Sequence, residues 1–171
     1  EKRFVRKEGQ HVHVLVSASL VRDSNGVPIS FVEQIQDITV RKQAEQERDR
    51  LFLESLNLLV VGGYDGNFKR VNPIWFDCVG YAPEELADRP FLDFVHPDDR
   101  ERTIVELTRL ASGQNVKGFE IRLIHKDRSI RWISWNATPL QAGLTFYATG
   151  QDMTERKLAQ ERVQAASSKA V

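Results

Sequence analysis

The sequence has little cysteine, no long hydrophobic run and no excess of charge of either sign. Cys78 is the one cysteine in 171 residues, so no disulfide can form within the chain, which fits a reducing, cytoplasmic compartment. No run of apolar residues approaches the roughly 20 that a membrane-spanning helix needs. Lys and Arg number 24, as do Asp and Glu, so the formal net charge is zero. This balance argues against a nucleic-acid or membrane-surface partner.

One motif occurs twice in the chain. Gln36–Lys42 (QDITVRK) returns 115 positions later as Gln151–Lys157 (QDMTERK). Further upstream, Lys7–Gln10 matches Lys126–Ser129 at an offset of 119, so the first copy carries four extra residues. We place them at the hairpin signal Asp23–Gly26, because a solvated turn tolerates insertions. A repeat of this kind predicts tandem modules rather than one large fold.

The first module is predicted to be a small antiparallel sheet. Val12, Val14 and Val16 alternate with His11 and His13, which is typical of a strand with one apolar face. A sheet of two or three strands is marginally stable while that face is exposed. We therefore expect a neighbouring chain or the following helix to cover it. The chain also starts inside this copy, without an initiator Met, so we expect it to be part of a longer protein.

The two modules are predicted to be joined by a helix. Residues 41–52 are rich in good helix formers, and Thr39 is a suitable N-cap. In the second module a longer helix is expected to begin with Asp98 as N-cap and Glu101 completing a capping box, and to end near Gly113. Short helices are expected between the second strand and this helix. Five strands are predicted, at residues 56–61, 67–71, 119–125, 130–140 and 144–151.

The repeat also predicts which face of the fourth of these strands is buried. An offset of 119 aligns the apolar face of the first copy with Ile133, Trp135 and Ala137, which we therefore expect to lie in the core. Trp132 is then left on the outer face of the sheet. An exposed Trp there would be a candidate interaction surface, unless the linker helix covers it.

Three further motifs accompany the repeated one: Asp65–Pro73 (DGNFKRVNP), Gly80–Leu86 (GYAPEEL) and Phe94–Arg100 (FVHPDDR). Together they make the chain resemble the PAS sensor domain with its C-terminal PAC segment. The resemblance implies an α+β fold, with a five-stranded antiparallel sheet and helices on one face. It covers a complete domain in the second module and the C-terminal half of another in the first. The expected organisation is residues 1–40 (partial PAS domain), 41–52 (helical linker), 53–153 (complete PAS domain) and 154–171 (outgoing helix).

The resemblance further implies a non-catalytic module for signal input or dimerisation. Such modules usually precede a histidine kinase of a two-component system or a diguanylate cyclase, so the expected partners are a second copy of the chain and such an effector domain. The repeated motif would join the last strand to the outgoing helix, with its Asp or Thr capping the helix and its Arg pairing with an acidic residue. The alternative is that these residues only cap a helix. The residues concerned are Asp37, Thr39, Arg41, Asp152, Thr154 and Arg156.

The sequence departs from the family pattern at two positions. Ala82 stands where a Ser or Thr usually precedes Pro-Glu-Glu-Leu, so a side-chain cap is lost. Arg128 replaces the Gly that usually follows Lys-Asp, which calls into question a tight turn with positive φ.

The familiar cofactors of the family are not favoured by the sequence. Cys78 lacks the surroundings of the flavin-binding subgroup, so we interpret it as a buried apolar cysteine. Residues 103–112 contain no His that could serve as an axial haem ligand. His96, Asp98 and Asp99 are better explained by helix capping than by metal binding. No nucleophile elbow, phosphate loop or paired carboxylates indicate an enzyme.

A small organic ligand between helices and sheet remains an open alternative to a packed core. Ligand pockets have apolar walls with a few convergent polar groups. Candidate apolar residues for this space are Trp75, Phe76, Phe91, Phe94, Trp135 and Tyr147, and candidate polar residues are Asn72, Asn136 and Thr149. Nothing in their spacing distinguishes residues that line a pocket from residues that fill it.

Overall fold

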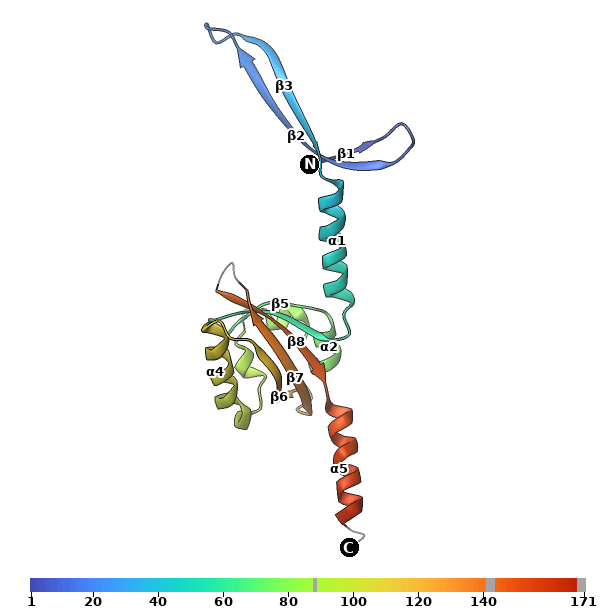
Figure 1. Ribbon diagram of the computed structural model, residues 1–171, viewed down its shortest axis with the longest axis vertical. Helices are drawn as coiled ribbons and strands as arrows, with labels where there is room; N and C mark the ends of the chain where they lie inside the picture. Colours follow the sequence, from blue (N-terminus) through green and yellow to red (C-terminus); the bar gives the residue numbers. More distant parts are fainter. Residues whose placement is uncertain (88, 141–143, 169–171) are drawn as a thin grey trace. The chain divides into compact units, whose positions relative to one another are not determined.

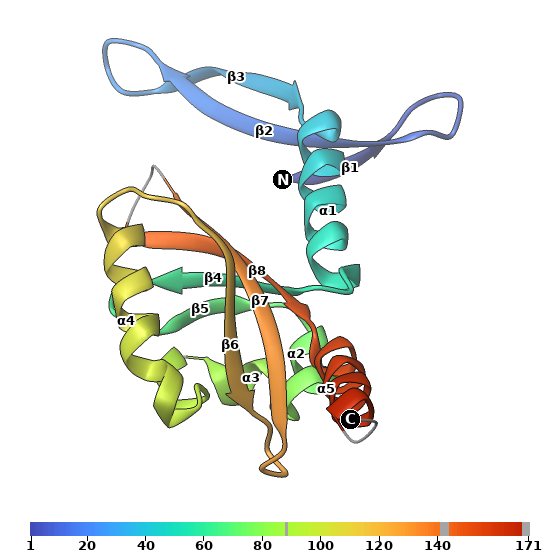
Figure 2. The same cartoon turned by 60° about the horizontal axis from the view of Figure 1, so that its bottom comes forward.

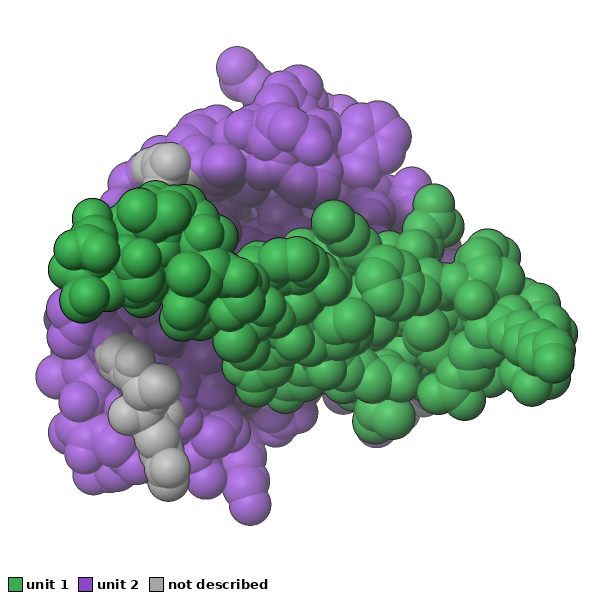
Figure 3. All heavy atoms as spheres, turned by 90° about the horizontal axis from the view of Figure 1, so that it is seen from above, with its two compact units in different colours: residues 1–51 green, residues 52–171 purple. Residues whose placement is uncertain are grey.

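The computed structural model describes residues 1–87, 89–140 and 144–168. The chain divides into two compact units, residues 1–51 and residues 52–171 (Figure 3). The last three positions of the expected outgoing helix, 169–171, lie outside the described residues. Among the described residues, none of the helices combines the length and the apolar character that crossing a bilayer requires.

The first unit is an antiparallel three-stranded sheet followed by a helix (Figure 1). The predicted hairpin is confirmed: Asp23 accepts hydrogen bonds from the backbone N–H groups of Asn25 and Val27, and Gly26 supplies the positive φ of the turn, 81°. Helix α1 begins at Thr39 and is longer at both ends than the predicted linker. The elements are β1 (Lys2–Val5), β2 (His11–Arg22), β3 (Pro28–Asp37) and α1 (Thr39–Glu54).

The apolar face of this first sheet is covered at one end only. Val12 and Val14 are buried, whereas Leu20, Phe31 and Ile35, farther along the hairpin, are 54%, 69% and 51% exposed. Exposed apolar side chains gathered on two paired strands are typical of a surface that binds a partner. That a neighbouring chain covers them stays a prediction.

The second unit has the fold that the resemblance implied: a five-stranded antiparallel sheet in the order β5-β4-β8-β7-β6, with α4 lying along it (Figure 2). The outer strands β5 and β6 are the two edges, and the central strand β8 continues into α5. The elements are β4 (Leu58–Gly63), β5 (Phe68–Val71), α2 (Ile74–Val79), α3 (Pro83–Leu86), a 3-10 turn (Phe91–Asp93), α4 (Pro97–Ala111), β6 (Val116–Ile124), β7 (Ile130–Pro139), β8 (Thr145–Asp152) and α5 (Thr154–Ser168).

The predicted core face of β7 is confirmed. Ile133, Trp135 and Ala137 are buried. The indole of Trp135 lies 5.9 Å, centroid to centroid, from that of Trp75 and 5.8 Å from the perpendicular ring of Phe91. Edge-to-face and tilted pairs at such distances add to the stabilisation from burial alone.

The two units share strand register as well as sequence. Lys2 lies opposite Val14 in the first sheet, as Ile121 lies opposite Ile133 in the second. On the other side of the middle strand, Val14 pairs with Asp37 and Ile133 with Asp152. The first comparison keeps the sequence offset of 119 for both residues, and the second relates Asp37 to Asp152 by the offset of 115. The three strands of the first unit therefore correspond residue by residue to β6, β7 and β8.

The predicted capping box of the long helix is wrong. Helix α4 begins at Pro97, and the Nδ1 atom of His96, not Asp98, caps it by accepting a hydrogen bond of 3.3 Å from the backbone N–H of Asp98. Pro97 at the first helical position fixes φ for the helix, whose N-cap lies two residues before the predicted one. Asp99, in the first turn, makes a contact with the sheet that is described below.

The short helix α3 lacks a side-chain cap at Ala82, as the sequence predicts. The reciprocal bond is present, since the Glu85 carboxylate accepts from the backbone N–H of Ala82 at 2.9 Å. Lys126 binds the same carboxylate at 2.6 Å and helps to lower the pKa of Glu85. Pro83 occupies the first helical position, as expected.

The doubted turn at Arg128 has a positive φ after all, 71°, at the position matching Gly9, whose φ is 82°. A non-glycine residue is strained there by about 1 kcal/mol. We expect Arg128→Gly, in an exposed turn, to raise the free energy of unfolding by about 1 kcal/mol in urea titrations, and Gly9→Arg to lower it. A destabilised Arg128→Gly protein would contradict this prediction.

Candidate functional site

The outgoing helix α5 is joined to the sheet by hydrogen bonds that we call the second clasp, made by Trp132, Asp152, Met153 and Thr154. The hydroxyl of Thr154 accepts from the backbone N–H of Trp132 at 2.9 Å, and the Asp152 carboxylate accepts from the backbone N–H of Thr154 at 2.8 Å. Met153 donates its backbone N–H to the carbonyl of Trp132 at 2.7 Å. Thr154 is buried, so the first residue of the helix is fixed to β7.

The first clasp, made by His13, Asp37, Ile38 and Thr39, repeats these bonds one by one. Thr39 accepts from the backbone N–H of His13 at 3.0 Å, and Asp37 accepts from the backbone N–H of Thr39 at 2.9 Å. Ile38 donates to the carbonyl of His13 at 2.8 Å. The Thr39 bonds, and then Arg6, hold the pKa of the Asp37 carboxyl below its usual value. One geometry thus starts both helices.

The ion pair assigned to the motif's arginine is made by the lysine that follows it. Lys157 binds Glu120 on β6, and Lys42 binds Glu1 at 2.8 Å in the matching position of the first unit. Arg156 makes no ion pair within the described part of the chain, so the expectation that it pairs back is wrong for the second clasp. Lys157, three residues after Thr154, lies on the side of the helix that faces β6. Arg41 does pair with Glu1, at 3.3 Å.

Trp132, expected on the outer face of the sheet, lies between two cations. The guanidinium of Arg122 is 5.4 Å from its ring centroid and the ammonium of Lys157 is 5.0 Å from it, both within cation–π range. The cover on this indole therefore comes from β6 and α5. His13 occupies the matching position in the first unit, so that unit keeps the clasp but lacks the indole platform.

The same Arg122 ties the beginning of α4 to the edge strand β6. Its backbone N–H, Nε and Nη2 each donate to the Asp99 carboxylate at 2.9 Å. Asp99 is 4% exposed, and Arg122 lowers the pKa of its carboxyl to about 2. A bidentate, charge-assisted pair is among the stronger polar contacts in proteins. Side-chain contacts thus run without a gap from α4 through Arg122 and Trp132 to Lys157 on α5.

Cys78 is buried on α2 and contacts the second clasp. Its thiol donates to the free carboxylate oxygen of Asp152 over 3.6 Å. Burial, and then the negative charge of Asp152, raise the pKa of the Cys78 thiol to about 12. The group is therefore protonated at neutral pH, and it is the thiolate that reacts as a nucleophile.

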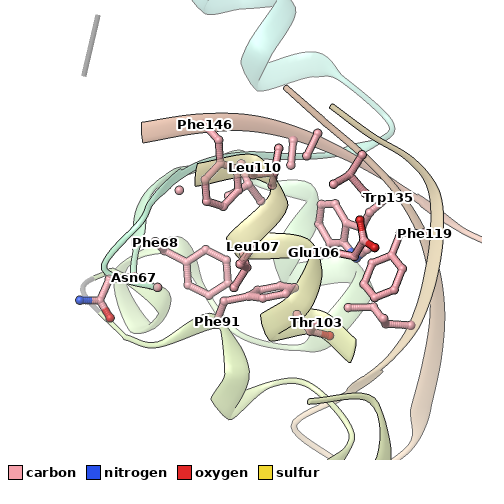
Figure 4. Close-up of a pocket in the computed structure, with 17 residues that line it drawn as sticks. Asn67, Phe68, Phe91, Thr103, Glu106, Leu107, Leu110, Phe119, Trp135 and Phe146 are labelled. Atoms are coloured by element: carbon pink, nitrogen blue, oxygen red, sulfur yellow. The ribbon is translucent and has the colours of Figure 1, made fainter. Parts of the chain in front are cut away.

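A cavity of about 50 Å³ lies between α4 and the sheet (Figure 4). Two of the sequence candidates, Phe91 and Trp135, line it. Ligand pockets for drug-sized molecules typically have volumes of about 300–1,000 Å³. The cavity is thus far smaller than a pocket that already holds such a molecule. The other prominent walls are Phe68, Leu107, Leu110, Phe119 and Phe146.

Three aromatic candidates lie elsewhere. Trp75 and Phe94 are almost completely buried in the packed core beside the cavity and do not line it. Phe76 is 57% exposed, so its expected place in the pocket is wrong. Trp75 and Phe76 are adjacent residues of the six-residue helix α2, and adjacent residues of a helix point in different directions.

Three other candidates, Asn136, Tyr147 and Thr149, lie on the opposite face of the sheet from the cavity. Each is next in sequence to a lining residue, Trp135 or Ala148, and successive strand residues point to opposite faces. Their expected place in the pocket is therefore wrong. Asn136 instead accepts from the backbone N–H of Gly118 at 3.0 Å. Burial raises the pKa of Tyr147.

Asn72, the remaining polar candidate, is completely buried and holds the start of the domain in place. Its Oδ1 accepts from the backbone N–H of Leu59 at 2.8 Å, and its Nδ2 donates to the carbonyls of Asn57 at 2.9 Å and Ser55 at 3.4 Å. It does not line the cavity. Its role is to satisfy the backbone where α1 gives way to β4.

The sequence reasoning missed the residues that the closing strand and α4 contribute to the cavity. Leu107 and Leu110 belong to the apolar stripe of an amphipathic helix, which by itself indicates a buried face and not a cavity. Phe146 could have been placed through its alternation with Ala148 on β8. Gly62 carried no signal, because its contribution is the lack of a side chain beneath the Phe146 ring.

Comparisons with known proteins agree with this geometry. A family model described as "PAS fold" matches residues 68–144, and one described as "PAS domain" matches residues 1–40. The probable diguanylate cyclase DgcE of Escherichia coli (strain K12) is 41% identical to the chain. That match covers 76% of the chain but only 14% of the relative.

Solved structures share the fold at low sequence identity. The PAS domain of a Colwellia psychrerythraea protein has a TM-score of 0.60 and 23% identity, covering 66% of the chain and 98% of its own. The PAS domain of the Cronobacter turicensis quorum-sensing receptor RpfR, in complex with C12:0, has a TM-score of 0.53 and 16% identity, covering 59% of the chain and 97% of its own. The solved structures share the fold, and the two family matches show that the chain belongs to the PAS family of sensor domains.

Proposed function

We propose that this chain is a non-catalytic sensor module that relays a signal from its second unit through α5 to an effector domain. The observation that carries the proposal is the clasp, which occurs twice with the same donors, acceptors and register. A helix whose first residue is fixed to a sheet moves with that sheet. A helix that is merely capped would need the Asp contact but not the bond from β7 to the Thr hydroxyl.

The contacts of Asp99, Arg122, Trp132 and Lys157, which we call the outer-face contacts, offer a second way for a displacement to reach α5. Asp99 lies in the first turn of α4, which forms one wall of the cavity, and its partner Arg122 contacts the ring of Trp132, as does Lys157. A displacement of α4 would therefore reach the start of α5 through charged and aromatic side chains in direct contact. Coupling between the cavity and α5 requires a part of the structure that can adopt two discrete conformations. We assign this role to the joint between β8 and α5.

The effector in this proposal is a diguanylate cyclase or a histidine kinase, with the module acting as a cytoplasmic homodimer. The relative from Escherichia coli, described as a probable diguanylate cyclase, supports the first choice. Leu158 and Val163 are 46% and 66% exposed on α5 and offer apolar surface for a second copy. Sedimentation that shows only monomer over a wide concentration range would count against the dimer.

The relay is tested by Thr154→Val in a fusion of the chain to a diguanylate cyclase domain placed after α5. Valine keeps the shape but removes the acceptor for Trp132, which shifts the joint by about 1 kcal/mol. Cyclase output is expected to change about fivefold, and the Trp132 amide is expected to exchange its hydrogen faster. The matched control is Thr108→Val, an exposed α4 threonine whose hydroxyl bonds only within its own helix, to Ile104. Unchanged output with a faster-exchanging amide would contradict the relay.

A second candidate function is a receptor for a small organic molecule in the cavity of the second unit. The specific observation in its favour is an unfilled space between α4 and the sheet. Helix α4, one wall of this space, also carries Asp99, the partner of Arg122. The RpfR structure, which shares the fold, is a complex with C12:0. Native mass spectrometry of gently purified protein would show a retained ligand as added mass. Protein that never carries added mass, even after incubation with candidate small molecules, would count against this function.

A further inference from the structure

One buried polar group at the cavity has no partner in the protein. Trp135 is 5% exposed, and its indole Nε1–H makes no hydrogen bond among the described residues. The neighbouring indole of Trp75, in the same core, donates to the carbonyl of Leu59 at 3.3 Å. Buried donors are nearly always paired, because an unpaired one loses its bonds to water without replacement. The unpaired N–H of Trp135 therefore calls for an acceptor that the chain itself does not provide.

The composition of the walls restricts what could supply that acceptor. The cavity is almost entirely apolar, and no Lys, Arg or His is among the described residues that line it. Within that described lining the charged side chain is that of Glu106 (Figure 4), whose carboxylate is held by Arg109 at 3.0 Å. A carboxylate ligand would meet a like charge there. A water molecule needs two to four polar partners, and the lining offers few: apart from Trp135, the polar side chains in its described part are Asn67, Thr103 and Glu106.

We propose that the cavity binds a small neutral organic molecule with an apolar body and one acceptor oxygen, such as a ketone, ester or lactone, and that Trp135 donates its indole N–H to that oxygen. The inference rests on the receptor function proposed above and names its ligand class. Glu106 excludes anions, the apolar walls hold the body of the molecule, and Trp135 fixes its orientation.

The volume requires a wall to move, and Phe146 is the side chain placed to do so. Its ring lies directly against the backbone of Gly62, where any Cβ would overlap it. Gly62 presents no side chain to this ring, and the ring of Tyr64 lies 5.8 Å from it, centroid to centroid. Turning the Phe146 ring outward enlarges the cavity at the end of the sheet where β4 and β8 pair, as Gly62 and Phe146 do.

The test uses three probes of similar size: 2-pentanone, its carbon isostere 2-methyl-1-pentene, and pentanoate. The ¹H–¹⁵N resonance of the Trp135 indole, identified by its absence in Trp135→Phe, is expected to move saturably downfield with 2-pentanone only. The ketone is expected to bind about fivefold more tightly than the isostere, the usual contribution of one hydrogen bond. Pentanoate is expected to bind more weakly than either.

The variant Trp135→Phe keeps an aromatic ring and removes the donor, so it should bind ketone and isostere equally. If it does not fold, the indole shift in the wild-type protein, assigned by triple-resonance spectra, decides alone. Equal binding of ketone and isostere by the wild type, or tightest binding of pentanoate, would overturn the ligand class while the receptor function stands. Binding of none of the probes, with no added mass in native mass spectrometry, would overturn both.

Discussion

Replacing Asp99 with alanine is expected to lower the free energy of unfolding of the second unit by about 3 kcal/mol, since breaking a buried ion pair leaves its partner charge uncompensated. Three donors of Arg122 lose their acceptor at once, one of them a backbone N–H on the edge strand β6. The guanidinium also loses its anchor above Trp132. Urea unfolding followed by tryptophan fluorescence measures the change.

The adjacent carboxylate provides the control. The side chain of Asp98 is 70% exposed and lies 3.5 Å from the same guanidinium, an arrangement worth about 0–1 kcal/mol. Asp98→Ala is therefore expected to change stability far less than Asp99→Ala. Similar losses in the two variants would mean that α4 is held by its general charge and not by the buried pair.

The buried pair of Asp99 and Arg122 should also make the stability depend on pH in acid. Hydrogen bonds from Arg122 lower the pKa of Asp99 to about 2, from 3.8 in an unfolded chain. A carboxyl with a lowered pKa stabilises the fold fully above its unfolded value and loses that effect as the pH falls through the folded value. The wild-type protein should thus lose about 2 kcal/mol between pH 5 and pH 2 that Asp99→Ala lacks. Parallel acid profiles for the two proteins would contradict this.

Replacing Asn72 with alanine is expected to cost about 2 kcal/mol, because the backbone N–H of Leu59 would be left buried without an acceptor. Both ends of the Asn72 amide are used, so no other residue type of this size reproduces its bonds to Leu59, Asn57 and Ser55. The loss should be visible in thermal or urea unfolding, and it should raise the hydrogen exchange of the Leu59 amide.

A second asparagine serves as the matched control for this change. Asn136 also accepts one backbone bond, from Gly118, but it is exposed, so water can replace it. Asn136→Ala is expected to cost less than about 0.5 kcal/mol. A result in which the two variants are equally destabilised would show that burial of the Asn72 amide contributes nothing.

The internal repeat predicted more of the fold than composition or periodicity did. It identified the buried face of β7 from the simpler pattern at Val14 and Val16, and it placed both clasps at the joints between strand and helix. It could do so because matching residues of the two units occupy the same positions in their strands. Since side chains alternate between the two faces of a strand, the buried face of one copy identifies that of the other. It failed at Arg156, because a matching position in the motif does not require a matching ion pair: Arg41 binds Glu1, whereas Glu120, which matches Glu1, is bound by Lys157.

For the candidate pocket, the sequence predicted little and the tertiary structure decided most. The sequence offered aromatic residues without a way to choose among them, and strand alternation relative to Trp135 and Ala148 excluded Asn136, Tyr147 and Thr149 only once the register was known. The contact between α4 and the sheet was likewise decided by the tertiary structure. That Asp99 binds Arg122 depends on the distance between two positions 23 residues apart in the sequence.

The sequence by itself determined the family, the repeated joint between strand and helix, and the core face of β7, because all three follow from short-range sequence patterns, the last two of them repeated in the chain. Only the tertiary structure decided which aromatic residues face an unfilled space, which indole lacks an acceptor, and which cations cover Trp132. These depend on how side chains from distant segments fill a shared volume, and no local pattern encodes that filling.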